Sequence, residues 1–164
     1  MAKAFTPGVL ALYRGTEKKS SALHLTVFRA TPHKAGYVKV EMTTGPKAFE
    51  YDWTQKIIFH LTIVELAALA ILNTQEVKFT HKTDAANGEH TERSKRLKVK
   101  PAPKGGAWID LSEFHPPNPD RTHSIAVNDE ELFALQLLCR EAIPLIIGWT
   151  MDLCRTSEDF KKIA

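Results

Sequence analysis

The chain has 164 residues, of which 43% are hydrophobic and 25% charged, and its formal net charge is +3. This length predicts one domain that buries about two-thirds of its unfolded surface, and every apolar run is shorter than the ~18 residues of a membrane span. The two cysteines, Cys139 and Cys154, form no CxxC pair. Their spacing argues against a metal knuckle or a disulfide-rich secreted domain and favours a reducing compartment.

The first half of the chain predicts four antiparallel strands followed by a helix. Alternating apolar and polar residues predict strands at 9–14, 23–28, 37–42 and 49–61. The polar run GTEKKSS at 15–21 is expected to be a loop. At Leu61 the pattern changes, because Thr62 and Glu65 have the spacing of a helix capping box. A short helix is therefore expected at 63–72, and its nearly all-round apolar surface predicts burial on more than one side.

The second half repeats this order of elements. Strands are expected at 76–81, 93–100, 107–111 and 121–127. Asn128 predicts the start of a second helix that runs to about Ile147, with Pro144 inside it. The predicted fold class is therefore α+β, with two antiparallel four-stranded sheets in a ββββα–ββββα order. We expect one domain at 1–149 and an acidic amphipathic or flexible tail at 150–164.

Patterns typical of catalysis are scarce. His90-Thr91-Glu92 has the HxE spacing of a zinc deaminase, but no PCxxC follows it, so a loop is the better interpretation. The seven histidines include no i,i+4 pair on a predicted helix that would hold a metal. The turn Pro103-Lys104-Gly105-Gly106 lacks the spacing of a phosphate-binding GxxxxGK[ST] loop. We therefore expect a protein that is not an enzyme and has no metal, cofactor or small-molecule substrate.

Charge is unevenly distributed along the chain. Residues 77–104 hold eight basic side chains and three acidic ones, whereas residues 128–164 hold four basic and seven acidic ones. A basic middle segment is typical of a surface that binds polyanions, and it is also typical of an ordinary solvated surface.

Basic and aromatic residues on the polar sides of the predicted strands are the candidates for binding single-stranded nucleic acid. Such a ligand is held by cations along its phosphates and by aromatic faces that stack on its bases, each worth about 1–3 kcal/mol. The phosphate-binding candidates are Lys39, Lys56, Lys78, Arg93, Arg96, Lys98 and Lys100, and the stacking candidates are Tyr37, Phe28 and Trp108. Packing against a neighbouring element or subunit is an equal alternative for Phe28 and Trp108. We interpret Phe49, Tyr51 and Trp53 as packing residues.

Three segments occur in order along the chain: Tyr51-Asp52-Trp53 with Lys56, Phe59, Leu61, Thr62 and Glu65, then Arg96-Leu97-Lys98-Val99, and finally Pro144 with Leu145, Ile147, Gly148 and Trp149. Together they resemble the Whirly family of plant single-stranded DNA-binding proteins. The resemblance extends with gaps from Tyr13 to Trp149. The family's KGKAAL stretch, associated with higher-order assembly, corresponds here only to GTEKKSSAL at 15–23.

This resemblance implies two sheets packed crosswise, with the helices at the core of a homotetramer and single strands bound along sheet edges between neighbouring protomers. The expected interface residues are Leu66, Leu69, Leu135, Leu138 and Ile146. The leading hypothesis is a protein that binds single-stranded DNA with little sequence specificity and serves DNA maintenance, repair or transcription. It would act in a mitochondrion, plastid or nucleus, or in the cytoplasm of a non-eukaryote. The alternatives are an RNA-binding or RNA-annealing factor, similar in fold to the trypanosomatid mitochondrial guide-RNA-binding proteins, and a protein-interaction scaffold.

Overall fold

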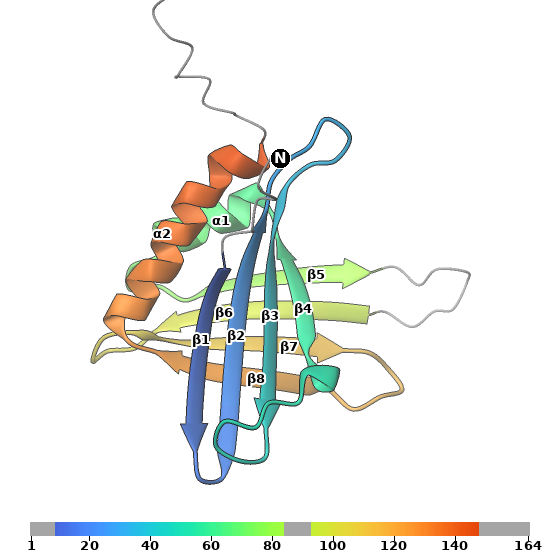
Figure 1. The fold of residues 1–164 in the computed structure, drawn as a ribbon, viewed down its shortest axis with the longest axis vertical. Helices are drawn as coiled ribbons and strands as arrows, with labels where there is room; N and C mark the ends of the chain where they lie inside the picture. The colour runs from blue at the N-terminus through green and yellow to red at the C-terminus, as the bar shows by residue number, and fades with distance from the viewer. Residues whose placement is uncertain (1–8, 84–92, 148–164) are drawn as a thin grey trace, which may run out of the picture.

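Two four-stranded antiparallel sheets cross one another, and two helices pack together at one side of the crossing (Figure 1). The structure is a computed structural model that describes residues 9–83 and 93–147. The first sheet contains β1 (Val9–Thr16), β2 (Lys19–Phe28), β3 (Tyr37–Gly45) and β4 (Ile57–Leu61), followed by α1 (Ile63–Ala70). The second contains β5 (Val77–Thr83), β6 (Arg93–Pro101), β7 (Ala107–Phe114) and β8 (Arg121–Val127), followed by α2 (Asp129–Ile146). The predicted α+β class, element order and crosswise packing are confirmed.

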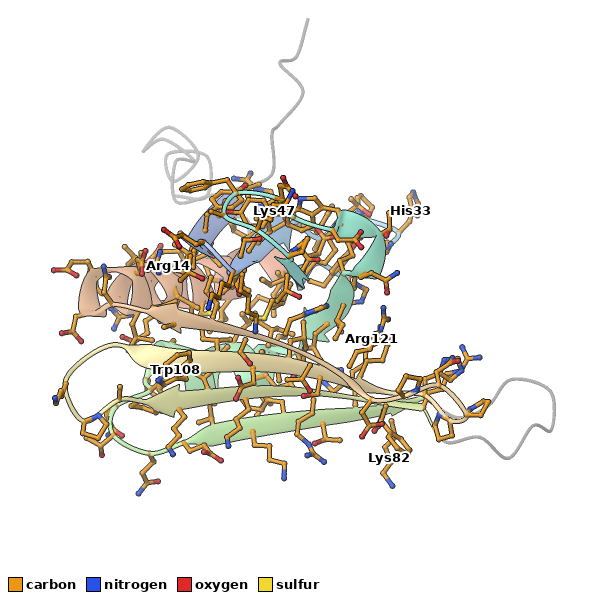
Figure 2. All side chains as sticks on the ribbon, turned by 90° about the horizontal axis from the view of Figure 1, so that it is seen from below. Arg14, His33, Lys47, Lys82, Trp108 and Arg121 are labelled. Carbon is orange, nitrogen blue, oxygen red and sulfur yellow. The ribbon has the colours of Figure 1, made fainter. Side chains whose placement is uncertain are left out.

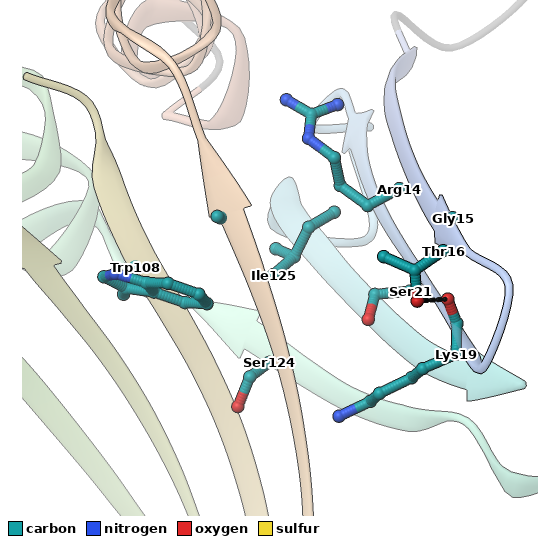
Figure 3. Close-up of a pocket in the computed structure, with 9 residues that line it drawn as sticks. Arg14, Gly15, Thr16, Lys19, Ser21, Trp108, Ser124 and Ile125 are labelled. Atoms are coloured by element: carbon teal, nitrogen blue, oxygen red, sulfur yellow. Dashed lines mark hydrogen bonds between the residues drawn. The ribbon is translucent and has the colours of Figure 1, made fainter.

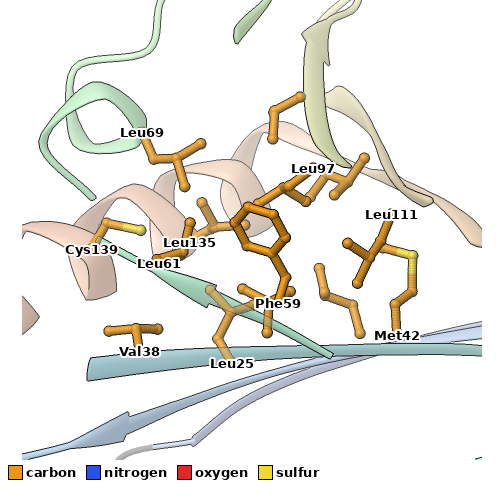
Figure 4. Packing of buried hydrophobic residues seen from close by; sticks show 14 of the residues in the cluster. Leu25, Val38, Met42, Phe59, Leu61, Leu69, Leu97, Leu111, Leu135 and Cys139 are labelled. Atoms are coloured by element: carbon orange, nitrogen blue, oxygen red, sulfur yellow. The ribbon is translucent and has the colours of Figure 1, made fainter. Parts of the chain in front are cut away.

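A single hydrophobic core joins both sheets and both helices. Its members come from every strand of the first sheet, from β6 to β8 and from the buried sides of the helices. Phe59 of β4 lies among Leu69, Leu97 and Leu135, which belong to three other elements (Figure 4). Because each sheet contributes one face to this core, its opposite face is turned outward.

Both helices begin at the predicted capping boxes. Thr62 and Glu65 exchange hydrogen bonds at the start of α1, and Asn128 and Glu131 do so at the start of α2. Each box satisfies two amide donors that lack intrahelical partners, so these starts are encoded locally. Of the described helices, none is long and apolar enough to cross a membrane.

The turns next to the two ends of α2 hold this helix in place. The amide of Gly106, in the β6–β7 turn, donates to the Asp129 carboxylate at 2.6 Å. At the other end, the amides of Ala30 and Gly36 donate to the carbonyls of Leu145 and Ile146 at 3.1 and 3.2 Å. A side chain at Gly36 would lie 2.6 Å from the Ile146 backbone, so this close approach requires glycine.

The strand predicted at 49–61 is wrong in its first half. Residues 49–56 form a loop with a short 3₁₀ turn at Trp53–Gln55, and β4 begins only at Ile57. The loop folds back onto the outer face of the first sheet, where the amide of Asp52 donates to the Thr44 carbonyl at 3.2 Å. Gly45 permits this return, because a Cβ there would lie 1.6 Å from the Glu50 carbonyl oxygen.

The aromatic residues of this loop have different environments. The Tyr51 ring packs against Tyr13 with centroids 5.3 Å apart, and the Trp53 ring lies 4.5 Å from that of His24. Packing is therefore confirmed for Tyr51 and Trp53. It is wrong for Phe49, whose side chain is 77% exposed.

The polar run at 15–21 is also mostly strand rather than loop. Thr16 pairs with Lys19, which leaves only Glu17 and Lys18 as the turn of a long β1–β2 hairpin. Charged and small residues on both faces of this hairpin end hide the alternation that normally identifies a strand.

Four of the five expected interface residues are buried inside this chain. Leu66, Leu69, Leu135 and Ile146 belong to its own core, and Leu138 is half-buried against that core. The assignment of the four buried residues to an oligomer surface is therefore corrected, whereas that of Leu138 stays a prediction. The large apolar side chains that the helices and their ends expose are Ile63, Val64, Ile71, Phe133, Leu137 and Ile147.

Three sequence features lie outside the described residues. They are the HxE sequence at 90–92, Gly148 and Trp149 of the third resembling segment, and the expected tail at 150–164.

Candidate nucleic-acid interface

The outer face of the second sheet is formed by the even-numbered residues of β5 to β8. Odd-numbered residues such as Leu97, Ile109 and Ile125 point into the core, so their even-numbered neighbours point outward. The strand register aligns the outer residues in rows across the sheet, and two rows are Lys78–Lys98–Asp110–Ser124 and Lys100–Trp108–Ala126. In Figure 2, Lys82 of this set points away from the strands at the lower side of the molecule.

This outer face is strongly basic. Among the outward, even-numbered residues that the structure describes on β5 to β8, only Asp110 is acidic, and Glu76 lies beside them just before β5. The basic ones are Lys78, Lys82, Arg96, Lys98 and Lys100. Lys98 pairs with Glu76 at 3.1 Å. Within the described residues, Lys78, Arg96 and Lys100 form no salt bridge, which leaves three cations available to an anionic ligand.

The register also places two like charges opposite each other. Lys78 of β5 is the direct cross-strand partner of Lys98 of β6. Like charges in this position destabilise a sheet, by up to about 1 kcal/mol. A bound polyanion would relieve this repulsion.

Two large aromatic side chains stand on the same outer face. Trp108 is 53% exposed and lies across from Lys100, and Phe114 is 44% exposed at the other end of β7. They are six positions apart in the sequence, which is about 20 Å along a strand. An uncovered indole next to a free cation is a suitable stacking platform. Phe114 was missed because the predicted strand ended at Leu111, although the alternation continues through Ser112.

Lys39 and Lys56 lie instead on the outer side of the first sheet, around Glu41. Their ammonium groups are 3.0 and 2.7 Å from the Glu41 carboxylate. Glu41 is buried, with only 8% of the residue exposed. Burial alone would raise the pKa of Glu41, but the hydrogen bonds from Lys56 and Lys39 hold it below its ordinary value. These two lysines therefore neutralise a buried carboxylate, which makes them weaker phosphate ligands than the unpaired cations of the second sheet.

Phe28 and Tyr37 stack on each other on the first sheet. Their ring centroids are 4.6 Å apart and their planes differ by 14°. The ammonium of Lys39 lies 5.5 Å from the Phe28 ring, and that of Lys34 lies 5.3 Å from the Tyr37 ring. Because each ring already uses one face on the other, neither is as open to a base as Trp108.

The predicted residues thus divide between two surfaces. Lys78, Arg96, Lys98, Lys100 and Trp108 share the outer face of the second sheet, whereas Phe28, Tyr37, Lys39 and Lys56 lie on the first sheet. Arg93 is exposed at the start of β6 but is odd-numbered, so it stands apart from the basic rows. No group of three potential metal ligands occurs within residues 9–83 and 93–147.

This crossed-sheet arrangement is the fold of solved Whirly structures. It superposes on the plant transcriptional regulator PBF-2 with a TM-score of 0.76 at 21% identity, over 92% of this chain and 88% of that one. For WHY3 from Arabidopsis thaliana the TM-score is 0.74 at 22% identity, over 93% and 95% of the two chains. The family profile described as Whirly transcription factor matches residues 21–138, and the chain belongs to the Whirly family.

Curated relatives match over most of this chain. It is 28% identical over 120 residues to the single-stranded DNA-binding protein WHY1, chloroplastic, of Zea mays, covering 71% of this chain and 45% of that protein. It is also 28% identical over 133 residues to the single-stranded DNA-binding protein WHY3, chloroplastic, of Arabidopsis thaliana, covering 79% and 49%. The chain therefore spans less than half the length of these relatives.

Proposed function

We propose that this chain binds single-stranded DNA with little sequence preference, along the outer face of the second sheet, and that it acts by binding rather than by catalysis. The observation that carries this proposal is the uncovered basic face, where unpaired cations lie beside the exposed Trp108. Phosphate contacts and stacking are tolerant of sequence, because every nucleotide offers a phosphate and a π-face. The printed names of the relatives support DNA as the ligand.

Function in DNA maintenance, repair or transcription follows from such binding. The description of the family as transcription factors supports a role in transcription. Of the compartments expected from the sequence, the plastid is the one that the names of the chloroplastic relatives support.

We further propose that the chain forms a homo-oligomer, with a tetramer as the expected stoichiometry. The two helices pack against each other and expose Val64 and Ile71 near α1 and Phe133 and Leu137 on α2. Exposed apolar side chains gathered on neighbouring elements are typical of protein interfaces. These side chains replace the four core residues as the proposed contact surface.

Fluorescence anisotropy with labelled oligonucleotides tests the DNA-binding proposal. Replacing Trp108 by alanine should weaken binding of single-stranded DNA by about 1–3 kcal/mol, or roughly 5- to 150-fold. Phe49→Ala is the control, because Phe49 is an even more exposed aromatic residue on a loop of the first sheet. Equal losses in the two variants, or no binding by the unmodified chain below micromolar concentrations, would contradict the proposal.

The same titration separates the alternatives. Competition between DNA and RNA of one sequence decides which polymer is preferred, because the cations and the indole of this face fit both. A duplex should bind more weakly than a single strand, because its paired bases cannot stack on Trp108.

A further inference from the structure

A groove lies where the β1–β2 hairpin passes the β8 edge of the second sheet. Its volume is about 380 Å³. The hairpin contributes Arg14, Lys19 and Ser21, and the second sheet contributes Trp108 and Ser124 (Figure 3). No acidic side chain is among the described residues that line the groove. Within the described sheets β8 pairs with β7 alone, so its other edge is open toward the hairpin.

The two cations of the groove differ in availability. The Arg14 guanidinium donates to the Glu131 carboxylate and, at 2.8 Å, to the Tyr13 carbonyl. Lys19 is exposed and forms no salt bridge within the described part of the chain. In Figure 3 its ammonium group extends across the groove toward Ser124. Lys19 is therefore the cation that an incoming anion can pair with directly.

The opposite wall of the groove is the indole of Trp108. Ile125 and Ala126 of β8 also line the groove, and Ser21 and Ser124 supply hydroxyl groups. A flat aromatic surface, hydroxyl groups and a cation match the base, sugar and phosphate of a nucleotide in turn. The volume lies at the lower end of the range for small-molecule sites, about 300–1,000 Å³, which suits one such unit.

We propose that this groove holds one internal nucleotide of the bound strand, with its base against Trp108 and its phosphate at Lys19. This inference rests on the DNA-binding function proposed above and extends it. The strand would leave the outer face of the second sheet at Trp108, cross the β8 edge and continue onto the hairpin. The groove is formed within one chain, in contrast to the binding between neighbouring protomers that the sequence resemblance implies.

The test compares Lys19→Gln with Lys18→Gln, which removes the same charge one residue away, in the hairpin turn and outside the groove lining. The slope of log K against log[salt] should be reduced by about 0.7 in Lys19→Gln, the value for one phosphate contact with a single strand. Lys18→Gln should keep the original slope. If the unmodified chain binds DNA but the two variants have the same slope, the groove inference is overturned while the proposed function stands. If the unmodified chain does not bind DNA, both fail.

Two further comparisons identify the occupant and the number of chains required. Oligonucleotides with and without a 5′-phosphate should respond equally to Lys19→Gln, whereas a response confined to the phosphorylated strand would place a strand end in the groove and overturn the proposal. The Lys19→Gln effect should persist in chains made monomeric by Phe133→Asp, or by Val64→Asp if the first variant does not fold. Its loss in a folded monomer would show that the groove needs a neighbouring chain, which also overturns the inference.

Discussion

The unpaired cations of the second sheet should determine the salt dependence of DNA binding. The decisive variant replaces Lys78, Arg96 and Lys100 by glutamine, because no salt bridge holds them within the described residues. Each phosphate contact contributes about −0.7 to the slope of log K against log[salt] for a single strand. The triple variant should therefore have a slope shallower by about 2. Over a fourfold rise in salt, the unmodified chain should lose roughly 18-fold more affinity than the variant.

The variant should lose binding without losing its fold. Lys78 lies opposite Lys98, so removing its charge relieves a repulsion and should leave the free energy of unfolding unchanged or raise it by up to about 1 kcal/mol. Chemical denaturation measures this, and anisotropy at a series of salt concentrations measures the slope. The control removes three exposed cations elsewhere, Lys18, Lys47 and Arg140, of which Lys47 pairs with Glu50 at 3.5 Å. An unchanged slope in the first variant, or an equal change in the control, would refute the assignment of phosphate contacts to this face.

Three further predictions concern assembly, packing and pH. Phe133→Asp should dissociate the proposed oligomer at little cost to folding, because Phe133 is 65% exposed, and light scattering measures this. Leu135→Ala should cost about 2–5 kcal/mol of stability, because Leu135 is buried, and denaturation measures this. Gly45→Ala should lower the melting temperature because its Cβ meets a carbonyl at 1.6 Å, and Gly15→Ala, with its nearest contact at 3.4 Å, should not. The Glu41 carboxyl has a folded-state pKa below its ordinary 4.5, so its stabilising contribution is present above pH 4.5 and is lost as the pH falls through the folded pKa. Glu41→Gln should flatten the dependence of stability on pH in this acidic range.

Each of these predictions has a result that contradicts it. A folded Phe133→Asp protein with the parent mass would remove α2 from the proposed interface. Equal melting temperatures for the two glycine variants would show that the loop relaxes away from the added methyl group. If the stability of Glu41→Gln falls with decreasing pH as steeply as that of the unmodified chain, other carboxyl groups control stability at low pH.

Features set by neighbouring residues were predictable from the sequence. The capping boxes at Thr62 and Asn128 involve residues only three positions apart, so the helix starts follow from local hydrogen bonding alone. The alternation along β6 and β7 likewise separates inward from outward residues, which is why Arg96 and Trp108 could be placed on the polar side of their strands before the fold was known.

Features set by distant contacts were not predictable. Residues 49–55 alternate like a strand, but the return of the loop depends on how Gly45 meets Glu50. Because α1 is apolar on all sides, its sequence does not show which side faces the core. Leu66 could therefore not be assigned to the core, or Val64 to the surface, in advance. The pairing of Lys56 with Glu41 likewise depends on where the loop before β4 places Lys56. Lys39 and Glu41, by contrast, are two residues apart on β3, so alternation alone puts them on one face.

The anchoring of α2 at both ends has a consequence for assembly. Gly106 holds its first turn, and Ala30 and Gly36 hold its last, so the helix is oriented before any second chain arrives. Preorganisation of this kind lowers the entropic cost of association, because the contact surface need not be ordered on binding. In the proposed oligomer, the β2–β3 and β6–β7 turns would therefore influence subunit affinity from a distance. A bulkier residue at Gly36 would tilt the helix and should weaken that assembly without changing a residue of the proposed contact surface.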